Sequence, residues 1–257
     1  MEIRMEALTS REIEERINQG TDIAVFPIGS VEQHGQHCPV GTDGIISLAI
    51  ARGVAEKLGA LCLPPLWYGM SSHHMAFPGT LTIRPEVLGA VVEDVLESLI
   101  HHGIKNILIL NGHGGNTASI SSACAKVRYR HPGVFLAQSS VWLALNDVYE
   151  GFPPEVRQES WPTMVAHGGL FETSAVMAVD EGMVKMDRAR SAPVDKHVLA
   201  TDPVMSVTVR MQELSDWGSD GDPRGSTPEL GKMFLEKSIE IIGAKYGEAI
   251  KNFPTID

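Results

Sequence analysis

Short apolar runs alternate along this chain with longer segments of helical periodicity, and this alternation limits the folds open to it. The apolar runs have the length of β-strands and lie at residues 22–28, 60–63, 106–110 and 134–139. The helical segments lie at about residues 9–19, 43–58, 86–102 and 117–131. Strands that alternate with helices form parallel sheets whose two faces are both covered. The pattern predicts an α/β fold, a single-domain three-layer α/β/α sandwich over residues 1–257 with a mainly parallel sheet.

Local signals place the ends of several helices. Thr9 and Glu12 form a capping-box pattern at the start of the first helix. Thr42 is the expected N-cap of the second helix, and Gly59 closes that helix. A last helix, at about residues 228–250, carries an apolar stripe and is expected to pack against the sheet.

The composition favours a compact enzyme over a nucleic-acid or membrane protein. The chain has 257 residues and 43% hydrophobic content, which suffices for one sizeable core. Its net charge of −11 argues against nucleic acid and anionic membranes as partners, because both favour a basic surface. There is no apolar run of about 18 residues, and the N-terminal segment is a charged amphipathic helix rather than a signal peptide. Three cysteines without paired spacing fit a reducing compartment, so we expect a cytoplasmic protein.

Three side chains of the metal-binding types follow the first predicted strand. Glu32, His34 and Asp43 occur in the run GSVEQHGQHCPVGTD. In an extended loop, residues two apart point the same way, so a carboxylate and an imidazole can face one ion. An E-x-H pair taken alone is more often exposed to solvent than bound to a metal, so further residues must support the interpretation.

A glycine-rich turn with one histidine follows the third predicted strand. His113 stands in NGHGGN, just beyond the carboxyl end of that strand, where ligands bind in open α/β sheets. It meets the Glu32 loop if the two strands are neighbours. The alternative is a phosphate-binding loop, but the turn lacks the G-x-G-x-x-G pattern and no Lys-Ser or Lys-Thr pair follows it.

A third cluster, AHGGLFETS, carries His167 and Glu172. Glu172 precedes an apolar run and is predicted near the start of a helix. A carboxylate there also suits the helix dipole, which is the alternative explanation of its position. The stretches at residues 146–168 and 188–227 are rich in Pro, Gly and Asp and are predicted loops, of the kind that form lids or subunit contacts.

Four motifs together resemble the creatininase family, in that family's order and spacing: GSVEQHGQHCPVGTD, GMSSHHMAFPGTLTI, NGHGGN and HGGLFETS. The resemblance covers nearly the whole chain. It implies a metal-dependent amidohydrolase that assembles as a homohexamer. It also implies a site for two divalent ions, with four ligands here: Glu32, His34, Asp43 and His113.

The resemblance implies that Asp43 bridges the two ions. The fifth ligand is less direct. The histidine turn of creatininase itself has the form GHYEN, and its Glu is a ligand, but Gly115 stands at that position here. Family members with the GHGGN form are expected to use the Glu of FETS, so Glu172 is the expected fifth ligand and a catalytic residue.

The resemblance also implies the residues that contact the substrate. His167 matches the histidine that acts on the substrate beside the metals, and Ser71 and His74 are expected at the substrate mouth. Trp161 is the expected lid aromatic, with Trp142 as an alternative. The residues that help creatininase to hold creatinine are replaced by Thr163, Met164 and Ala166, so the substrate need not be creatinine.

The expected ligand set has a definite chemistry. Carboxylates and imidazoles without thiolates suit Zn, Mn or Fe. Two such ions can activate a water for attack on a carbonyl carbon, which predicts hydrolysis of a C–N bond in a small polar amide or cyclic amide. The alternatives are a deformylase or peptide-trimming member of the family, a non-catalytic binding protein, and a nucleophilic Cys38.

Overall fold

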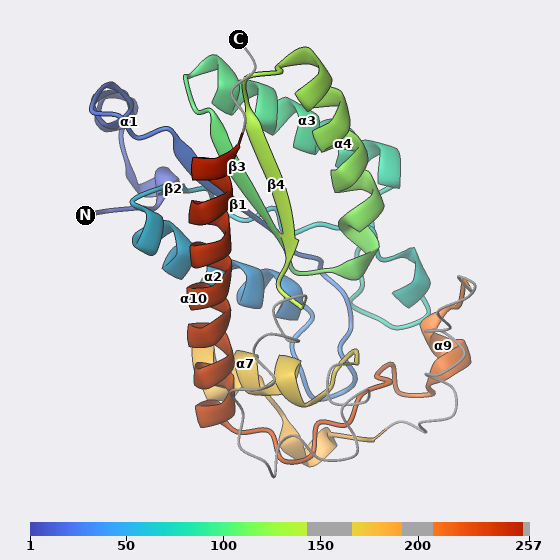
Figure 1. Cartoon of the computed structure of the whole chain (residues 1–257). Coiled ribbons are helices and arrows are strands. Elements are labelled where there is room, and N and C mark those ends of the chain that lie inside the picture. The colour runs from blue at the N-terminus through green and yellow to red at the C-terminus, as the bar shows by residue number, and fades with distance from the viewer. Residues whose placement is uncertain (143–165, 192–207, 254–257) are drawn as a thin grey trace.

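A four-stranded parallel sheet lies at the centre of the molecule (Figure 1). The structure is a computed structural model that describes residues 1–142, 166–191 and 208–253. The strand order is β2-β1-β3-β4, and the strands are β1 (Ile23–Ile28), β2 (Leu61–Cys62), β3 (Asn106–Asn111) and β4 (Phe135–Ser140). The parallel sheet predicted from the apolar runs is confirmed.

The register of the central strands brings two loops together. Ile28, the last residue of β1, pairs with Asn111, the last residue of β3. The loop that carries Glu32 therefore starts beside the turn that carries His113. In Figure 1 the strand arrows point toward the end of the molecule at which α7 lies.

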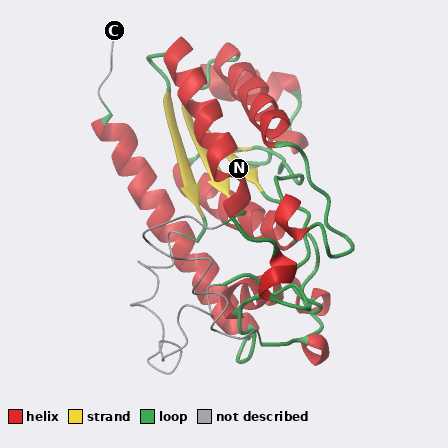
Figure 2. Ribbon diagram, turned by 90° about the vertical axis from the view of Figure 1, so that its right-hand side faces the viewer, coloured by secondary structure: helices red, strands yellow, loops and turns green. Residues whose placement is uncertain are grey.

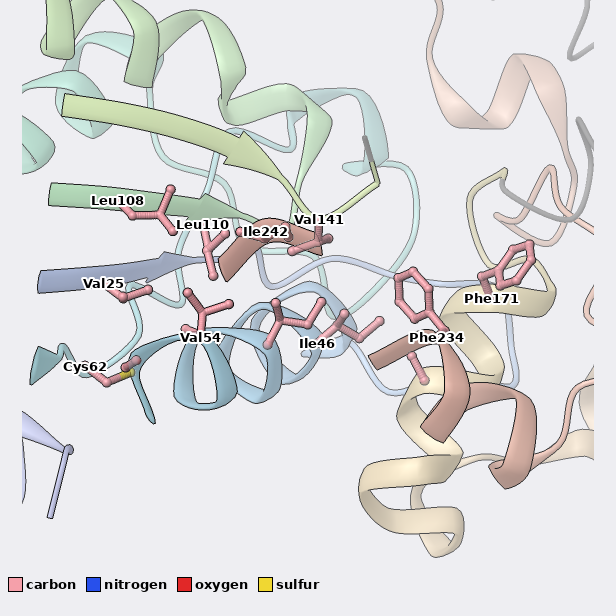
Figure 3. Close-up of a cluster of buried hydrophobic side chains, with 14 of the residues drawn as sticks. Val25, Ile46, Val54, Cys62, Leu108, Leu110, Val141, Phe171, Phe234 and Ile242 are labelled. Carbon is pink, nitrogen blue, oxygen red and sulfur yellow. The ribbon is translucent and has the colours of Figure 1, made fainter. Parts of the chain in front are cut away.

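Helices cover both faces of the sheet (Figure 2), which confirms the three-layer α/β/α prediction. Their bounds are α1 (Ser10–Asn18), α2 (Thr42–Leu58), α3 (Pro85–His101), α4 (Thr117–Arg130), α7 (Leu170–Asp180), α9 (Met211–Leu214) and α10 (Pro228–Asn252). Side chains of β1 alternate between the two layers. Phe26 packs with α3 and α4, whereas Val25 packs with α2, α7 and α10 (Figure 3). Among the described helices, none is both long and apolar enough to cross a membrane.

Two expectations about helices need correction. Gly41, not Thr42, precedes α2, and Thr42 is its first residue; the Thr42 hydroxyl donates to the Pro39 carbonyl at 2.7 Å, and no side-chain hydrogen bond caps this end of α2. The last helix packs on the sheet only in part. α10 lies mainly along α7 and α2 and reaches the sheet at β4, where the rings of Phe135 and Tyr246 are 5.4 Å apart. The expected capping box of Thr9 and Glu12 is present.

Gly231 of α10 sets the close approach to α7. A Cβ at this position would lie 1.8 Å from the carbonyl oxygen of Ser174, whereas one at Gly247 of the same helix would make an ordinary 3.5 Å contact with Leu58. Gly231→Ala is expected to lower the free energy of unfolding by about 1–3 kcal/mol through overpacking. Gly247→Ala should raise it by roughly 0.5–1 kcal/mol, because alanine is the better helix former. Urea unfolding of both variants tests this, and equal effects would show that the helices separate freely.

Candidate metal centre

The loop after β1 buries its acidic and imidazole side chains against the start of α2. Gly29 makes this possible, since a Cβ there would lie 2.4 Å from the Gly44 backbone. The Glu32 amide donates to the Val40 carbonyl at 2.8 Å and closes the loop. Glu32, His34 and Asp43 are 1%, 0% and 2% exposed. The expectation for an isolated E-x-H pair, exposure to solvent, therefore does not apply here.

Asn116 ties the turn after β3 to this loop. Its side-chain amide donates to the Gly29 carbonyl at 2.9 Å and its oxygen accepts from the Met70 amide at 2.9 Å. His113 is thereby held against the loop, with its Nδ1 3.1 Å from Glu32 Oε2 and 3.3 Å from Asp43 Oδ2. The sequence showed no sign of this role for Asn116 beyond its place in the glycine-rich turn.

Glu172 enters from a third segment, the first turn of α7. Its Oε2 accepts from the Gly168 amide at 2.6 Å and lies 3.5 Å from His34 Nε2. The same His34 nitrogen is 3.2 Å from Asp43 Oδ1. The structure thus brings together all five side chains that the sequence predicted as ligands.

These side chains form two groups that are compact enough to hold a metal ion each. One group is Glu32, Asp43 and His113, and the other is His34, Asp43 and Glu172. Within each group the potential ligand atoms lie within 4.8 Å of one another. Asp43 belongs to both, so one carboxylate can serve two ions.

The histidines have the hydrogen bonds typical of metal ligands. His113 Nε2 lies 3.0 Å from the Met70 carbonyl and His34 Nδ1 lies 3.1 Å from the Glu32 carbonyl. A carbonyl can only accept, so each ring donates through that nitrogen and turns the other toward the carboxylates. Metal-binding histidines are held in this way. Asp43 Oδ2 is buried and, among the described residues, accepts no hydrogen bond, which also fits an oxygen that binds a cation.

In the absence of ions, the pKa values of His34 and His113 are controlled by the carboxylates that lie close to them. Burial alone would lower the pKa of His34, but Glu172, Asp43 and Glu32 outweigh it and raise that pKa to about 10. Burial is likewise outweighed at His113, whose pKa is raised well above its usual value by Glu32 and Asp43. Burial raises the pKa of Glu172 to about 7. The group therefore holds protons in the positions that cations would take.

The expected substrate residues lie on the Glu32 side of the cluster. His167 Nδ1 is 3.6 Å and His74 Nε2 is 3.4 Å from Glu32 Oε1. Ser71 is fully buried and its hydroxyl donates to Glu32 Oε2. Ser30 Oγ lies 2.5 Å from Ser71 Oγ. Trp161 lies outside the described residues, as does most of the predicted loop at residues 146–168.

His37 and Cys38, which lie in the same loop as the proposed ligands, both contact the Thr173 hydroxyl beside Glu172. His37 is buried and its Nε2 lies 3.0 Å from Thr173 Oγ1, beside Glu172. Burial lowers the pKa of His37 to about 4, so the ring is neutral. Cys38 Sγ is 3.5 Å from the same Thr173 hydroxyl, and burial raises the pKa of its thiol to about 12. A nucleophilic Cys38 is disfavoured, because the thiolate is the reactive form.

Residue 115, which is glycine here, has no room for a side chain that could bind a metal in this conformation. A Cβ at this position would lie 2.4 Å from His113 Nε2 and 2.4 Å from the Met70 carbonyl. A side chain at residue 115 would therefore displace His113. This geometry favours Glu172 as the third carboxylate.

The family is settled by comparison with known proteins. Residues 6–245 match the family described as creatininase, creatinine amidohydrolase. The chain belongs to the creatininase family. This confirms the resemblance found in the sequence and makes the protein a hydrolase that acts on carbon–nitrogen bonds other than peptide bonds.

Relatives whose names describe different reactions are similar in sequence to this chain. The creatinine amidohydrolase of Pseudomonas putida is 30% identical over 91% of this chain and 92% of its own length. The mycofactocin precursor peptide peptidase of Mycolicibacterium smegmatis is 28% identical over 90% of this chain and 85% of its own length. A 2-amino-5-formylamino-6-ribosylaminopyrimidin-4(3H)-one 5'-monophosphate deformylase of Methanosphaera stadtmanae is 30% identical, over 38% of this chain and 42% of its own.

Solved creatininase structures share the fold, and two of them are metal forms. A manganese form superposes with a TM-score of 0.84 at 28% identity, covering 99% of this chain and 100% of that chain. A mutant of Zn–Zn type has a TM-score of 0.83 at 27% identity with the same coverage. The creatininase fold is thus present along essentially the whole chain.

Proposed function

We propose that this chain is a dinuclear metal-dependent amidohydrolase that cleaves a C–N bond in a small polar amide or cyclic amide. The observation that carries the proposal is the pair of buried groups that share Asp43. One ion would be held by Glu32, Asp43 and His113, and the second by His34, Asp43 and Glu172. The donor set suits Zn, Mn or Fe, and the manganese and zinc forms of solved relatives support the first two.

The mechanism divides between the ions and the protein. When bound, the ions supply an activated water and polarise the carbonyl group. His167, whose Nδ1 faces Glu32, would take the proton from the attacking water and deliver it to the leaving nitrogen. Glu172, whose carboxylate is oriented by the Gly168 amide, would serve as a catalytic residue by holding an ion together with His34 and Asp43.

We propose that His74 and Trp161 contact the substrate. Ser71 was expected beside them, but its full burial and its bond to Glu32 favour a role in holding that carboxylate. Relatives with peptide and formylamino-pyrimidine substrates support the coarse class, an amide of a small polar molecule. Residues 1–257 would form one catalytic domain of a cytoplasmic homo-oligomer, a hexamer as the family resemblance implies.

Metal reconstitution tests the proposal. Purified protein is stripped with chelator, reloaded with Mn, Zn or Fe, and assayed with a panel of lactams, formamides and short peptides. We expect about two ions per chain and hydrolysis of at least one amide class. Protein that stays metal-free after reconstitution would refute the metal centre, and metal-loaded protein that hydrolyses only peptides would refute the substrate class.

Metal binding should release protons. At pH 7 His34, with its pKa near 10, and His113 are both protonated in the metal-free site, and a ligand imidazole must be neutral. Loading at pH 7 is therefore expected to release between two and three protons per chain, one from each histidine and about half of one from Glu172, whose pKa is about 7, and to tighten as pH rises toward 10. Calorimetry in two buffers of different ionisation enthalpy measures the release, and affinity that is constant with pH would contradict it.

The stability of the metal-free protein has the opposite pH dependence. A raised pKa means that protonation of His34 stabilises the fold fully below pH 6.5. That contribution is lost as pH rises through about 10. The melting temperature of chelator-treated protein should therefore fall as pH rises over this range. The melting temperature of the metal-loaded protein should not show this fall.

A further inference from the structure

Gln33 stands between the two proposed ligands Glu32 and His34 and has no role so far. Gln33 is 4% exposed, and the orientation of its carboxamide is determined by backbone groups. Oε1 accepts from the Gly35 amide at 2.9 Å, and Nε2 donates to the Gly218 carbonyl at 2.6 Å. A backbone amide can only donate and a carbonyl can only accept, so the carboxamide cannot be turned over.

The second hydrogen of the Gln33 amide determines the state of His74. Gln33 Nε2 lies 2.8 Å from His74 Nδ1. Since the amide donates, Nδ1 accepts and a neutral His74 carries its proton on Nε2. That N–H faces Glu32 Oε1 at 3.4 Å.

The backbone of Gln33 determines the state of His167. The Gln33 carbonyl lies 2.6 Å from His167 Nε2, so this nitrogen is the donor. Nδ1 of a neutral His167 therefore carries a lone pair and no proton, and this nitrogen lies 3.6 Å from Glu32 Oε1. Gln33 Nε2 and His167 Nε2 lie 3.2 Å apart. Because both nitrogens are then donors, this contact is not a hydrogen bond.

We propose that Gln33 is a positioning residue that gives the two histidines beside Glu32 complementary roles. Both rings carry the proton on Nε2, but His74 presents its N–H to the site and His167 presents its lone pair. An N–H suits a substrate carbonyl, and a lone pair suits the proton of an attacking water. The catalytic consequence rests on the proposed function, whereas the protonation pattern does not.

Gly218 supports the view that this placement is specific. A Cβ at residue 218 would lie 2.0 Å from Gln33 Oε1, and its φ of +90° is one that side chains rarely adopt. The loop around Gly218 therefore leaves room for the carboxamide only because this residue is glycine.

The test uses imidazole ¹⁵N NMR of zinc-loaded full-length protein labelled at histidine, with signals assigned by His74→Gln and His167→Gln. Gln33→Glu places an acceptor opposite His74 Nδ1. We expect it to move the His74 proton from Nε2 to Nδ1, while His167, held by the backbone, is unchanged. Gln36→Glu is the matched control, because Gln36 is exposed on the same loop and should leave both rings as in the wild type.

Each outcome is decisive. A wild-type His74 protonated on Nδ1, or a Gln33→Glu variant with an unchanged His74, overturns the inference and leaves the metal centre intact. Failure of the wild type to bind zinc, manganese or iron instead refutes the proposed function. If Gln33→Glu does not fold, Gln33→Met replaces it: a kcat about 10–100-fold lower at wild-type zinc content supports the role, and an unchanged kcat refutes it. This assay uses the formamide or lactam that the wild type hydrolyses fastest.

Discussion

Asp43→Ala is expected to remove both metal ions and all detectable hydrolysis. Asp43 is the residue common to the two proposed sites, and its oxygens lie 3.2 Å from His34 Nε2 and 3.3 Å from His113 Nδ1. Each site would be left with one carboxylate and one imidazole. An open pair of ligands binds such ions far more weakly than a closed group, so both ions should be lost in one step.

Metal analysis and activity of the reconstituted variant measure the effect. Asp43→Asn keeps the volume but removes the charge, and it should behave like Asp43→Ala if the carboxylate is the bridge. Asp94→Ala, at an exposed position on α3, is the matched control and should retain metal and activity. Retention of either ion by Asp43→Ala would exclude the bridging role.

Glu172→Gln is expected to lower the metal content from about two ions to about one per chain and to abolish most activity. Only the group with His34 loses a charged ligand, since Glu32, Asp43 and His113 are untouched. Glutamine can still accept from the Gly168 amide, so the start of α7 should keep its structure. Loss of one ion removes the shared activation of water on which a dinuclear mechanism depends.

Glu181→Gln, an exposed position just after α7, is the control for this substitution. Adding Gly115→Glu to Glu172→Gln should not restore the second ion, because a Cβ at residue 115 collides with His113. Full metal content in Glu172→Gln would identify a different fifth ligand. His167 is the alternative, since it groups with Glu32 and His34.

Local sequence signals predicted most of the fold correctly. Apolar runs marked the four described strands, and most clearly β1 and β3, because a parallel strand that is buried on both faces needs apolar side chains. β4 is only half-buried and ends in Gln138, Ser139 and Ser140, so its apolar signal comes from its first residues. The error at Thr42 arose because a threonine before a helix is usually a cap, whereas here its hydroxyl donates to Pro39. The error at α10 arose because an apolar stripe indicates that a helix is buried but not which element covers it.

The candidate site was predicted less completely. Metal-binding side chains were recognised by type and motif, but Gln33 and Asn116 were missed because buried amides have no distinctive spacing. Their roles depend on backbone groups of remote segments, such as the Gly218 and Gly29 carbonyls. Ser71 was placed by resemblance near the substrate, while its contacts with Glu32 required the fold.

The architecture, the family and the chemical types of the candidate ligands follow from the sequence alone, because hydrophobic periodicity and motif order are properties of local chain segments. How those ligands are divided between two groups depends on the tertiary structure. The pairing of Ile28 with Asn111 brings the His113 turn to the Glu32 loop, and α7 carries Glu172 to His34. Asp43 is shared between two groups because three separate segments converge on the first turn of α2, and convergence of that kind depends on strand register and helix packing.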